Sequence, residues 1–265
     1  MRPSRPTLAS LRRDQHGFTL IETLVAMFSA VVVVGALYAI LDVSVQQAAR
    51  VTDVVQATQI GRTTMTKVVG ELHSACIASE FVPIQVGSME TTSNSEAKLV
   101  FINAYSKEAE ISTAYKHEIV WQKSTGLLVN RTYQSNGGTW PKFTFPATKT
   151  ETRLGEHIWE NPVKGKETEI EPMFQYYKYS KEASKLSSET EGLSTLKQIG
   201  LETKGAENIL TAKGAEEAAA VEINFRQGPV DKNVTEARST DLKTLVTLSF
   251  SVPNAETPIE AKPCE

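Results

Sequence analysis

The chain has 265 residues, a formal net charge of −3 and an isoelectric point near 5.9. This length is enough for one medium-sized domain with its own core and an appendage. Lysine and glutamate are mixed over the C-terminal two-thirds without a basic stripe, so nucleic acid is not expected as a partner. The two cysteines, Cys76 and Cys264, are too few for a disulfide framework and too far apart for a CxxC metal or redox site.

The N-terminus reads as a basic leader followed by a membrane anchor. Residues 1–17 contain four arginines against one aspartate, and an apolar run of 24 residues follows from Phe18 to Leu41. As a helix this run would be roughly 36 Å long, enough to cross a hydrocarbon core. The basic flank predicts a single pass with the N-terminus in the cytoplasm. A cleaved secretory signal is the alternative, but the run is long and no A-x-A-like site ends it.

Residues 42–80 continue the helix with one packing face. Proline is absent from Phe18 to Ser79, and apolar side chains recur at steps of three and four. This stripe consists of Val51, Val54, Met65, Val68, Leu72 and Ala75, with Thr58 and Gly61 as its weak middle. Asp53 is among the polar residues expected off the stripe. We predict one helix of about sixty residues, apolar all round in its first half, with weak points at Gly35, Gly61 and Gly70.

Residues 81–265 are predicted to form an extracytoplasmic, β-rich globular domain. Short segments rich in Val, Ile, Phe and Tyr occur at 97–106, 117–124, 126–134, 172–180, 219–227 and 243–252. A hairpin turn is expected at 124–126. A helix followed by strands without βαβ alternation predicts an α+β fold with an antiparallel sheet. The stretch 181–218 is a polar excursion, and the proline-containing tail 253–265 is expected to be extended.

The run Gly17-Phe18-Thr19-Leu20-Ile21-Glu22 has the form of a prepilin processing signature. Over about residues 10–80 the sequence resembles the type IV pilin and type II secretion pseudopilin superfamily. The resemblance implies a pilin-like fold, in which the long helix packs on an antiparallel sheet. It also implies that a membrane-embedded aspartyl prepilin peptidase cuts after Gly17, and that Phe18 then becomes N-methylated. Glu22 is implied to pair with the N-terminal amine of a neighbouring subunit during assembly.

The residues support these roles on physical grounds. Gly17 presents no side chain next to the scissile bond. A carboxylate inside an apolar run costs roughly 2.5–3.5 kcal/mol on insertion scales, so Glu22 is a functional candidate. The competing interpretation is that Glu22 only extends to the membrane interface near the helix end.

In length and in its N-terminal helix, the sequence is most similar to J-type minor pseudopilins or W-type minor pilins. This similarity implies other pilin or pseudopilin subunits, an assembly platform protein and its ATPase as partners. It implies residence in the cytoplasmic membrane and later in a fibre at the cell surface or in the periplasm. Two alternatives remain: a signal-anchored extracellular binding protein that never enters a fibre, and a membrane-tethered enzyme.

The remaining reactive residues give no catalytic or metal pattern. His73, His117 and His157 are scattered, and the acidic residues of 231–241 lack the spacing of an EF-hand. We therefore expect no enzyme activity, no cofactor and no metal. A bridge between Cys76 and Cys264 would close a loop of roughly 190 residues, and two unpaired thiols are the alternative.

Overall fold

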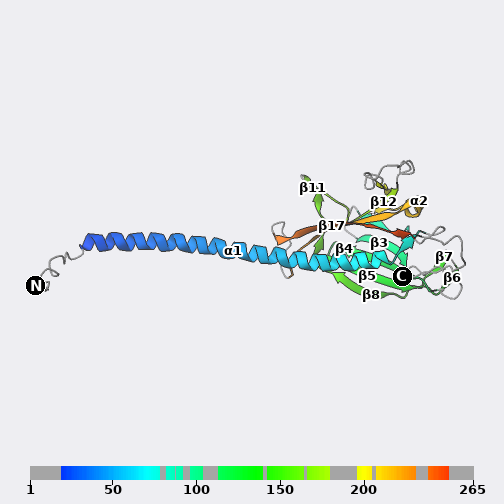
Figure 1. Cartoon of the computed structure of the whole chain (residues 1–265), viewed down its shortest axis with the longest axis horizontal. Coiled ribbons are helices and arrows are strands. Elements are labelled where there is room, and N and C mark those ends of the chain that lie inside the picture. Colours follow the sequence, from blue (N-terminus) through cyan, green and yellow to red (C-terminus); the bar gives the residue numbers. More distant parts are fainter. Residues whose placement is uncertain are drawn as a thin grey trace, which may run out of the picture. The chain divides into compact units, whose positions relative to one another are not determined.

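A computed structural model of the chain describes residues 19–77, 82–86, 88–91, 96–103, 113–139, 142–163, 166–179, 196–204, 207–230 and 238–250. The chain divides into two compact units, Met1–Arg50 and Val51–Glu265. Helix α1 (Leu20–His73) contributes to both units, and every other helix and strand described belongs to the second (Figure 1). The division falls inside the segment 42–80 that the sequence predicts to be amphipathic.

Helix α1 is uninterrupted over 54 residues. No proline occurs in it to remove a backbone donor or to collide with the preceding turn. Beyond His73, the N–H groups of Ser74 and Ala75 donate to the carbonyls of Glu71 and Leu72, which tightens the last turn and satisfies free carbonyls. The prediction of one long N-terminal helix is confirmed, with a few residues fewer at each end.

The larger sheet has seven strands in the order β14-β15-β2-β3-β4-β5-β8, all in antiparallel pairs. Its strands are β2 (Met89–Thr91), β3 (Glu96–Asn103), β4 (Tyr115–Gln122), β5 (Leu127–Gln134), β8 (Thr150–Gly155), β14 (Glu202–Lys204) and β15 (Glu207–Ile209). The turn between β4 and β5 closes with Gly126 N–H donating to Gln122 O at 2.8 Å. Gly126 has φ 66°, a left-handed conformation that favours glycine, so the predicted hairpin at 124–126 is confirmed.

The second sheet has five strands. Four run in the order β13-β12-β16-β17, and β9 pairs with one end of β16. Its strands are β9 (Ile158–Trp159), β12 (Phe174–Tyr179), β13 (Leu196–Gln198), β16 (Ala220–Gln227) and β17 (Thr240–Thr247). All of these pairings are antiparallel. Together with α1, the two sheets establish the α+β, pilin-like architecture that the sequence predicts.

Short elements complete the second unit. Helix α2 (Ala212–Glu217) is preceded by the N-cap Thr211, whose hydroxyl accepts a hydrogen bond from the N–H of Gly214. The remaining strands form two-stranded pairs: β1 (Cys76–Ile77) with β18 (Ser249–Phe250), β6 (Gly137–Thr139) with β7 (Lys142–Thr144), and β10 (Pro162–Val163) with β11 (Lys166–Ile170). Only the pair β1–β18 is parallel among the pairings described.

The core of the second unit joins the C-terminal part of α1 to both sheets. Met65, Val68 and Leu72 belong to one buried cluster with side chains of the two sheets. Its largest fully buried side chains are Trp121, Tyr176, Phe101, Phe174 and Phe225. The indole N–H of Trp121 donates to Ile158 O at 2.9 Å, so this polar atom is satisfied inside the core.

Two glycines allow the helix to approach the sheets closely. A Cβ at Gly61 would lie 2.2 Å from Leu242 Cδ1, and a Cβ at Gly155 would lie 2.7 Å from both Thr64 Cγ2 and Thr64 Oγ1. By contrast, a Cβ at Gly70 would meet nothing within 4 Å. Gly61 is therefore a packing position rather than only a weak point of the helix.

The buried stripe of α1 differs from the predicted one at its N-terminal end. Met65, Val68, Leu72 and Ala75 are buried as predicted, but Val51 is 63% exposed. Asp53, expected off the stripe, is only 4% exposed. The buried stripe runs through residues 53, 57, 61, 64 and 68. Several of these side chains are small, so the helix can pack closely against the sheets even where it has no large apolar residue.

The six strand segments expected from composition all coincide with strands, with shifts of up to about five residues at their ends. The shorter strands β1, β2, β6 to β11 and β13 to β15 were not expected from the sequence, whereas β18 falls within the predicted segment 243–252. Within the polar excursion 181–218, the described part contains α2 and three short strands, each paired to a sheet strand. The tail 253–265 lies outside the described residues.

Candidate functional site at the start of the long helix

The start of α1 has the local chemistry of a capped helix. Thr19 precedes the first helical residue, and its hydroxyl accepts a hydrogen bond from the N–H of Glu22 at 3.4 Å. The carbonyl of Thr19 accepts from the N–H of Thr23 at 3.2 Å, the first bond of the helical ladder. Thr19 is therefore the N-cap and Glu22 occupies the third helical position, the spacing of a Thr-x-x-Glu capping box.

Glu22 is exposed on the helix surface. A carboxylate in the first turn interacts favourably with the positive end of the helix dipole. The same position can offer the carboxylate to a cation brought by another chain. Sequence reasoning assigned Glu22 to assembly but missed Thr19, although the Thr-x-x-Glu pattern before an apolar run was present as a signal.

Gly17 and Phe18, the predicted processing positions, lie outside the described residues. Cleavage after Gly17 and methylation of Phe18 therefore stay predictions. Cleavage there would place the new amino terminus one residue before the N-cap Thr19 and four residues before Glu22.

The first half of α1 presents apolar side chains on every side. The large hydrophobic residues from Leu20 to Val45 are between 56% and 83% exposed. The helix is long and apolar enough to cross a membrane, and no residue of its most apolar stretch is buried. It is consistent with single-pass membrane anchoring near the N-terminus.

Three hydroxyl side chains of this half are satisfied within the helix. The hydroxyl groups of Thr23, Ser29 and Ser44 donate to carbonyl oxygens three or four residues earlier, at 2.8–3.2 Å. This pattern removes free hydroxyl donors from the apolar surface. Between Leu20 and Leu41, Glu22 is the only Asp, Glu, Lys or Arg in the sequence, so it is the one position there with a formal charge to be matched.

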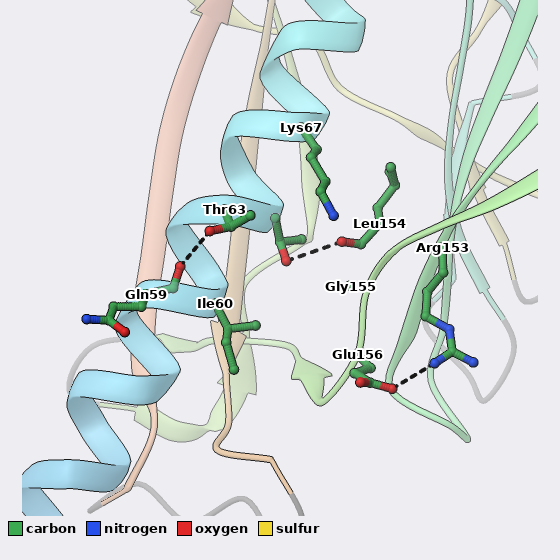
Figure 2. A pocket seen from close by; sticks show the side chains of 9 residues that line it. Gln59, Ile60, Thr63, Lys67, Arg153, Leu154, Gly155 and Glu156 are labelled. Atoms are coloured by element: carbon green, nitrogen blue, oxygen red, sulfur yellow. Dashed lines mark hydrogen bonds and ion pairs between the residues drawn. The ribbon is translucent and has the colours of Figure 1, made fainter.

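Farther along, α1 and the edge strand β8 border a groove of about 360 Å³ (Figure 2). Figure 2 shows Gln59, Thr63 and Lys67 on the helix side, and Arg153 to Glu156 on the strand side. The hydroxyl of Thr64 donates to Leu154 O at 3.4 Å, and Arg153 pairs with Glu156 at 3.0 Å. The latter pair is exposed and contributes little stability. At this groove, Gly155 of β8 packs closely against Thr64 of α1.

The end of α1 lies beside a buried polar cluster that gave no signal in the sequence. His117 is stacked on Phe101 at 5.1 Å and contacts the side-chain oxygens of Asn130 and Asn103 at 3.2 and 3.1 Å. Burial lowers the pKa of His117, although the carboxylate of Glu71, 3.6 Å away, acts to raise it. His117 is therefore a core histidine, and the cluster joins the sheet to the last turns of the helix.

Asp53, unlike His117, is a polar group that the sequence pattern placed wrongly, since it was expected off the packing face. Its carboxylate is 6% exposed and lies 3.7 Å from the guanidinium of Arg238, which precedes β17. The two residues are 185 positions apart in the chain, so periodicity could not connect them.

The two cysteines are only partly placed. The backbone of Cys76 pairs with that of Ser249 in the parallel strands β1 and β18. Cys264 lies outside the described residues, so the bridge stays a prediction. The pairing places Ser249, which is fifteen residues before Cys264 in the sequence, beside Cys76.

No group of three or more His, Cys, Asp or Glu residues is arranged to hold a metal ion within the described part of the chain. Of the acidic residues in 231–241, only Asp241 is described. Its carboxylate receives a bidentate ion pair from Arg226 at 2.6 and 3.1 Å, so its oxygens are already engaged.

Comparison with known proteins bears on the N-terminal segment. Residues 12–38 match the family model of the prokaryotic N-terminal methylation motif. No curated protein and no solved structure matches the chain. The matched segment includes Gly17, Phe18, Glu22 and most of the apolar run. The match supports a prepilin-type substrate like those of the type IV pilin and pseudopilin family, and it fits a structural rather than a catalytic protein.

Proposed function

We propose that this protein is a minor pilin or pseudopilin, of the kind represented by J-type pseudopilins or W-type minor pilins. Its contribution is structural: the apolar half-helix anchors the precursor in the membrane and then packs in the core of a fibre. The second unit supplies the fibre surface or tip. The observation that carries this proposal is the exposed apolar segment of α1 from Leu20 to Leu41, which contains one acidic residue and begins inside a matched methylation motif.

The proposed sequence of events starts with processing. Prepilin peptidase cleaves after Gly17, and the new amine on Phe18 is methylated. The chain then stays in the cytoplasmic membrane with its C-terminal unit outside until the assembly platform protein and ATPase extract it. In the fibre, partner pilin or pseudopilin helices replace lipid around the apolar side chains of Leu20 to Leu41.

Glu22 has two separable roles in this proposal. Its backbone N–H is held by Thr19, which starts the helix. Its carboxylate pairs with the N-terminal amine of a neighbouring subunit, where low dielectric strengthens the attraction. Removing one partner of such a pair leaves an uncompensated charge and is costly.

The test compares Glu22→Gln with Glu22→Ala and Thr19→Ala. Glutamine keeps the side chain of a capping box but removes the charge. Both Glu22 variants should be cleaved and retained in the membrane, yet lost from sheared fibres or from partner complexes. Thr19→Ala costs about 1 kcal/mol of helix capping and should still assemble.

Recovery of Glu22→Gln in fibres at wild-type stoichiometry would show that the residue only caps the helix. N-terminal sequencing of the mature chain tests the processing step independently. A chain beginning at methylated Phe18 supports the proposal, and a Gly17→Leu variant of normal mature size would contradict it. An unprocessed chain that never enters a fibre would favour the signal-anchored binding protein.

A further inference from the structure

The first turns of α1 in the second unit pack on the fold differently from its last turns. Residues 53–61, called the proximal segment below, bury only Asp53, Ala57 and Gly61, and none of these has a large apolar side chain. The residues of α1 that belong to the core cluster begin only at Met65. Burial of apolar surface is the main favourable contribution to packing, so the proximal segment receives little of it.

The larger aliphatic side chains of this part of the helix add little to the contact. Val51, two residues before the proximal segment, is 63% exposed, and Val55 within it is 49% exposed. Val54 and Ile60 are half-buried. The helix therefore meets the sheet mainly through small side chains, which permit a close approach but bury little apolar area.

The proximal segment lies on the edge of the five-stranded sheet that β17 forms. A Cβ at Gly61 would lie 2.2 Å from Leu242 Cδ1 and 3.0 Å from Gln227 Cβ, so the helix backbone contacts β17 and the end of β16 at this point. At the start of the segment, Asp53 meets Arg238, which precedes β17. Among the strands described, β17 pairs only with β16, so the segment rests on the last strand of the sheet.

The contact at the start of the segment is an ion pair with one hidden and one accessible partner. The carboxylate of Asp53 is 6% exposed and lies 3.7 Å from Arg238 Nε, whereas the side chain of Arg238 is 41% exposed. A carboxylate removed from water needs a matching cation, and loss of that cation leaves an uncompensated buried charge. If the arginine leaves, lifting the turn that carries Asp53 into water restores the solvation of the carboxylate.

The following turns of α1 are attached independently of this pair. The hydroxyl of Thr64 donates to Leu154 O at 3.4 Å, and its side chain packs closely on Gly155. From Met65 onward the helix contributes to the core cluster. Gly61 separates the two parts, and glycine is a weak point in a helix because of its backbone freedom. A bend at Gly61 therefore leaves the turns after it in place.

We propose that the Asp53–Arg238 pair is a conformational latch for the proximal segment. While the pair is closed, residues 53–61 lie on β17. When it opens, these turns lift from the sheet with Gly61 as the hinge, and the turns from Thr64 onward stay packed. The latch operates inside the second unit and is independent of the proposed function.

The experiment measures how readily the segment lifts in the full chain in detergent micelles. The probe is Ala57→Cys, at a position with 0% exposure, and the reagent is iodoacetamide. Peptide mass spectrometry separates the thiol at position 57 from Cys76 and Cys264. Adding Asp53→Asn should raise the alkylation rate at position 57 roughly tenfold or more. At a second probe, Val68→Cys in the core part of the same helix, Asp53→Asn should leave the rate unchanged.

Further variants show whether the effect belongs to the pair. Arg238→Gln should accelerate alkylation at position 57 as Asp53→Asn does. The double variant should react no faster than either single variant, because each of them already opens the pair. Arg153→Gln makes the same change at an exposed ion pair with Glu156 and is the matched control. It should leave the rate at the wild-type value.

Hydrogen exchange of the same variants without a cysteine probe shows that the probe itself does not cause the lifting. Exchange of the amides of residues 53–61 should become faster in Asp53→Asn, while exchange of residues 65–72 stays as in the wild-type chain. An equal acceleration in both parts would show that the pair supports the whole unit, and would overturn the latch. An unchanged alkylation rate at position 57 in Asp53→Asn would overturn it as well.

Discussion

The close contact between Gly155 on β8 and Thr64 on α1 gives a sharp test of how the second unit is packed. In Gly155→Ala, the new Cβ would lie 2.7 Å from two atoms of Thr64 and 2.9 Å from Ile158 Cδ1. Ordinary contact needs a separation larger by roughly 1 Å. Thr64 is buried and β-branched, so it cannot rotate away without strain.

Overpacking of this kind costs about 1–3 kcal/mol, and the alanine regains about 0.5–1 kcal/mol of backbone entropy. We therefore expect Gly155→Ala to lower the free energy of unfolding by about 1–2 kcal/mol. In a Thr64→Ala background both clashing atoms of Thr64 are gone and only the 2.9 Å contact with Ile158 Cδ1 remains, so Gly155→Ala should cost clearly less than it does in the wild-type chain. The coupling free energy of this double-mutant cycle should be about 1–3 kcal/mol.

The measurement is urea unfolding of the full chain in detergent, followed by tryptophan emission. Trp121 is a suitable reporter because it is buried and bonded to Ile158 O near the contact. Gly70→Ala is the matched control: nothing lies within 4 Å of its Cβ, so it should gain up to about 1 kcal/mol of stability. Additive effects of Thr64→Ala and Gly155→Ala would refute the packing of β8 against α1.

Three further outcomes are expected. A mature chain isolated from its extracytoplasmic location should contain no free thiol. Reduction of a Cys76–Cys264 bridge should lower the free energy of unfolding by up to about 5 kcal/mol. Full alkylation of both thiols without reduction would exclude the bridge. Burial lowers the pKa of His117 below 6.5 in the folded state, so on acidification the unfolded state binds a proton at a higher pH than the folded state does. The urea midpoint should therefore fall as the pH drops below 6.5, and His117→Gln should flatten that decline. A chain lacking residues 1–45 should be soluble and melt cooperatively in circular dichroism, because the second compact unit begins at Val51; a non-cooperative melt would place the boundary elsewhere.

Much of the fold follows from local patterns. The absence of proline from Phe18 to Ser79 and the continuous apolar run specify a long helix, because helix propensity and membrane length act through near neighbours. Segments such as 97–106 and 117–124 are recognisable as strands because their Val, Ile, Phe and Tyr content suits a pleated, half-buried surface. The short strands carry too few residues for a pattern, and their pairing partners alone stabilise them.

The candidate site also contains some residues that local sequence patterns reveal and others that they do not. Glu22 stands out in the sequence because one carboxylate within an apolar run has a large and local free-energy cost. Thr19 was equally local and was recognisable from the Thr-x-x-Glu spacing. The contact between Asp53 and Arg238 was not recognisable, since the two residues lie far apart in the sequence.

The sequence by itself determined the anchor, the helix, the acidic position within it and the α+β class, because each depends on interactions within a few residues. Only the tertiary structure decided that Asp53 is buried while Val51 is exposed, and that Gly61 and Gly155 are packing positions. It also placed His117 between two asparagines inside the core. These outcomes depend on which strands lie against which turn of α1, and that arrangement is set by the joint packing of both sheets rather than by any single segment.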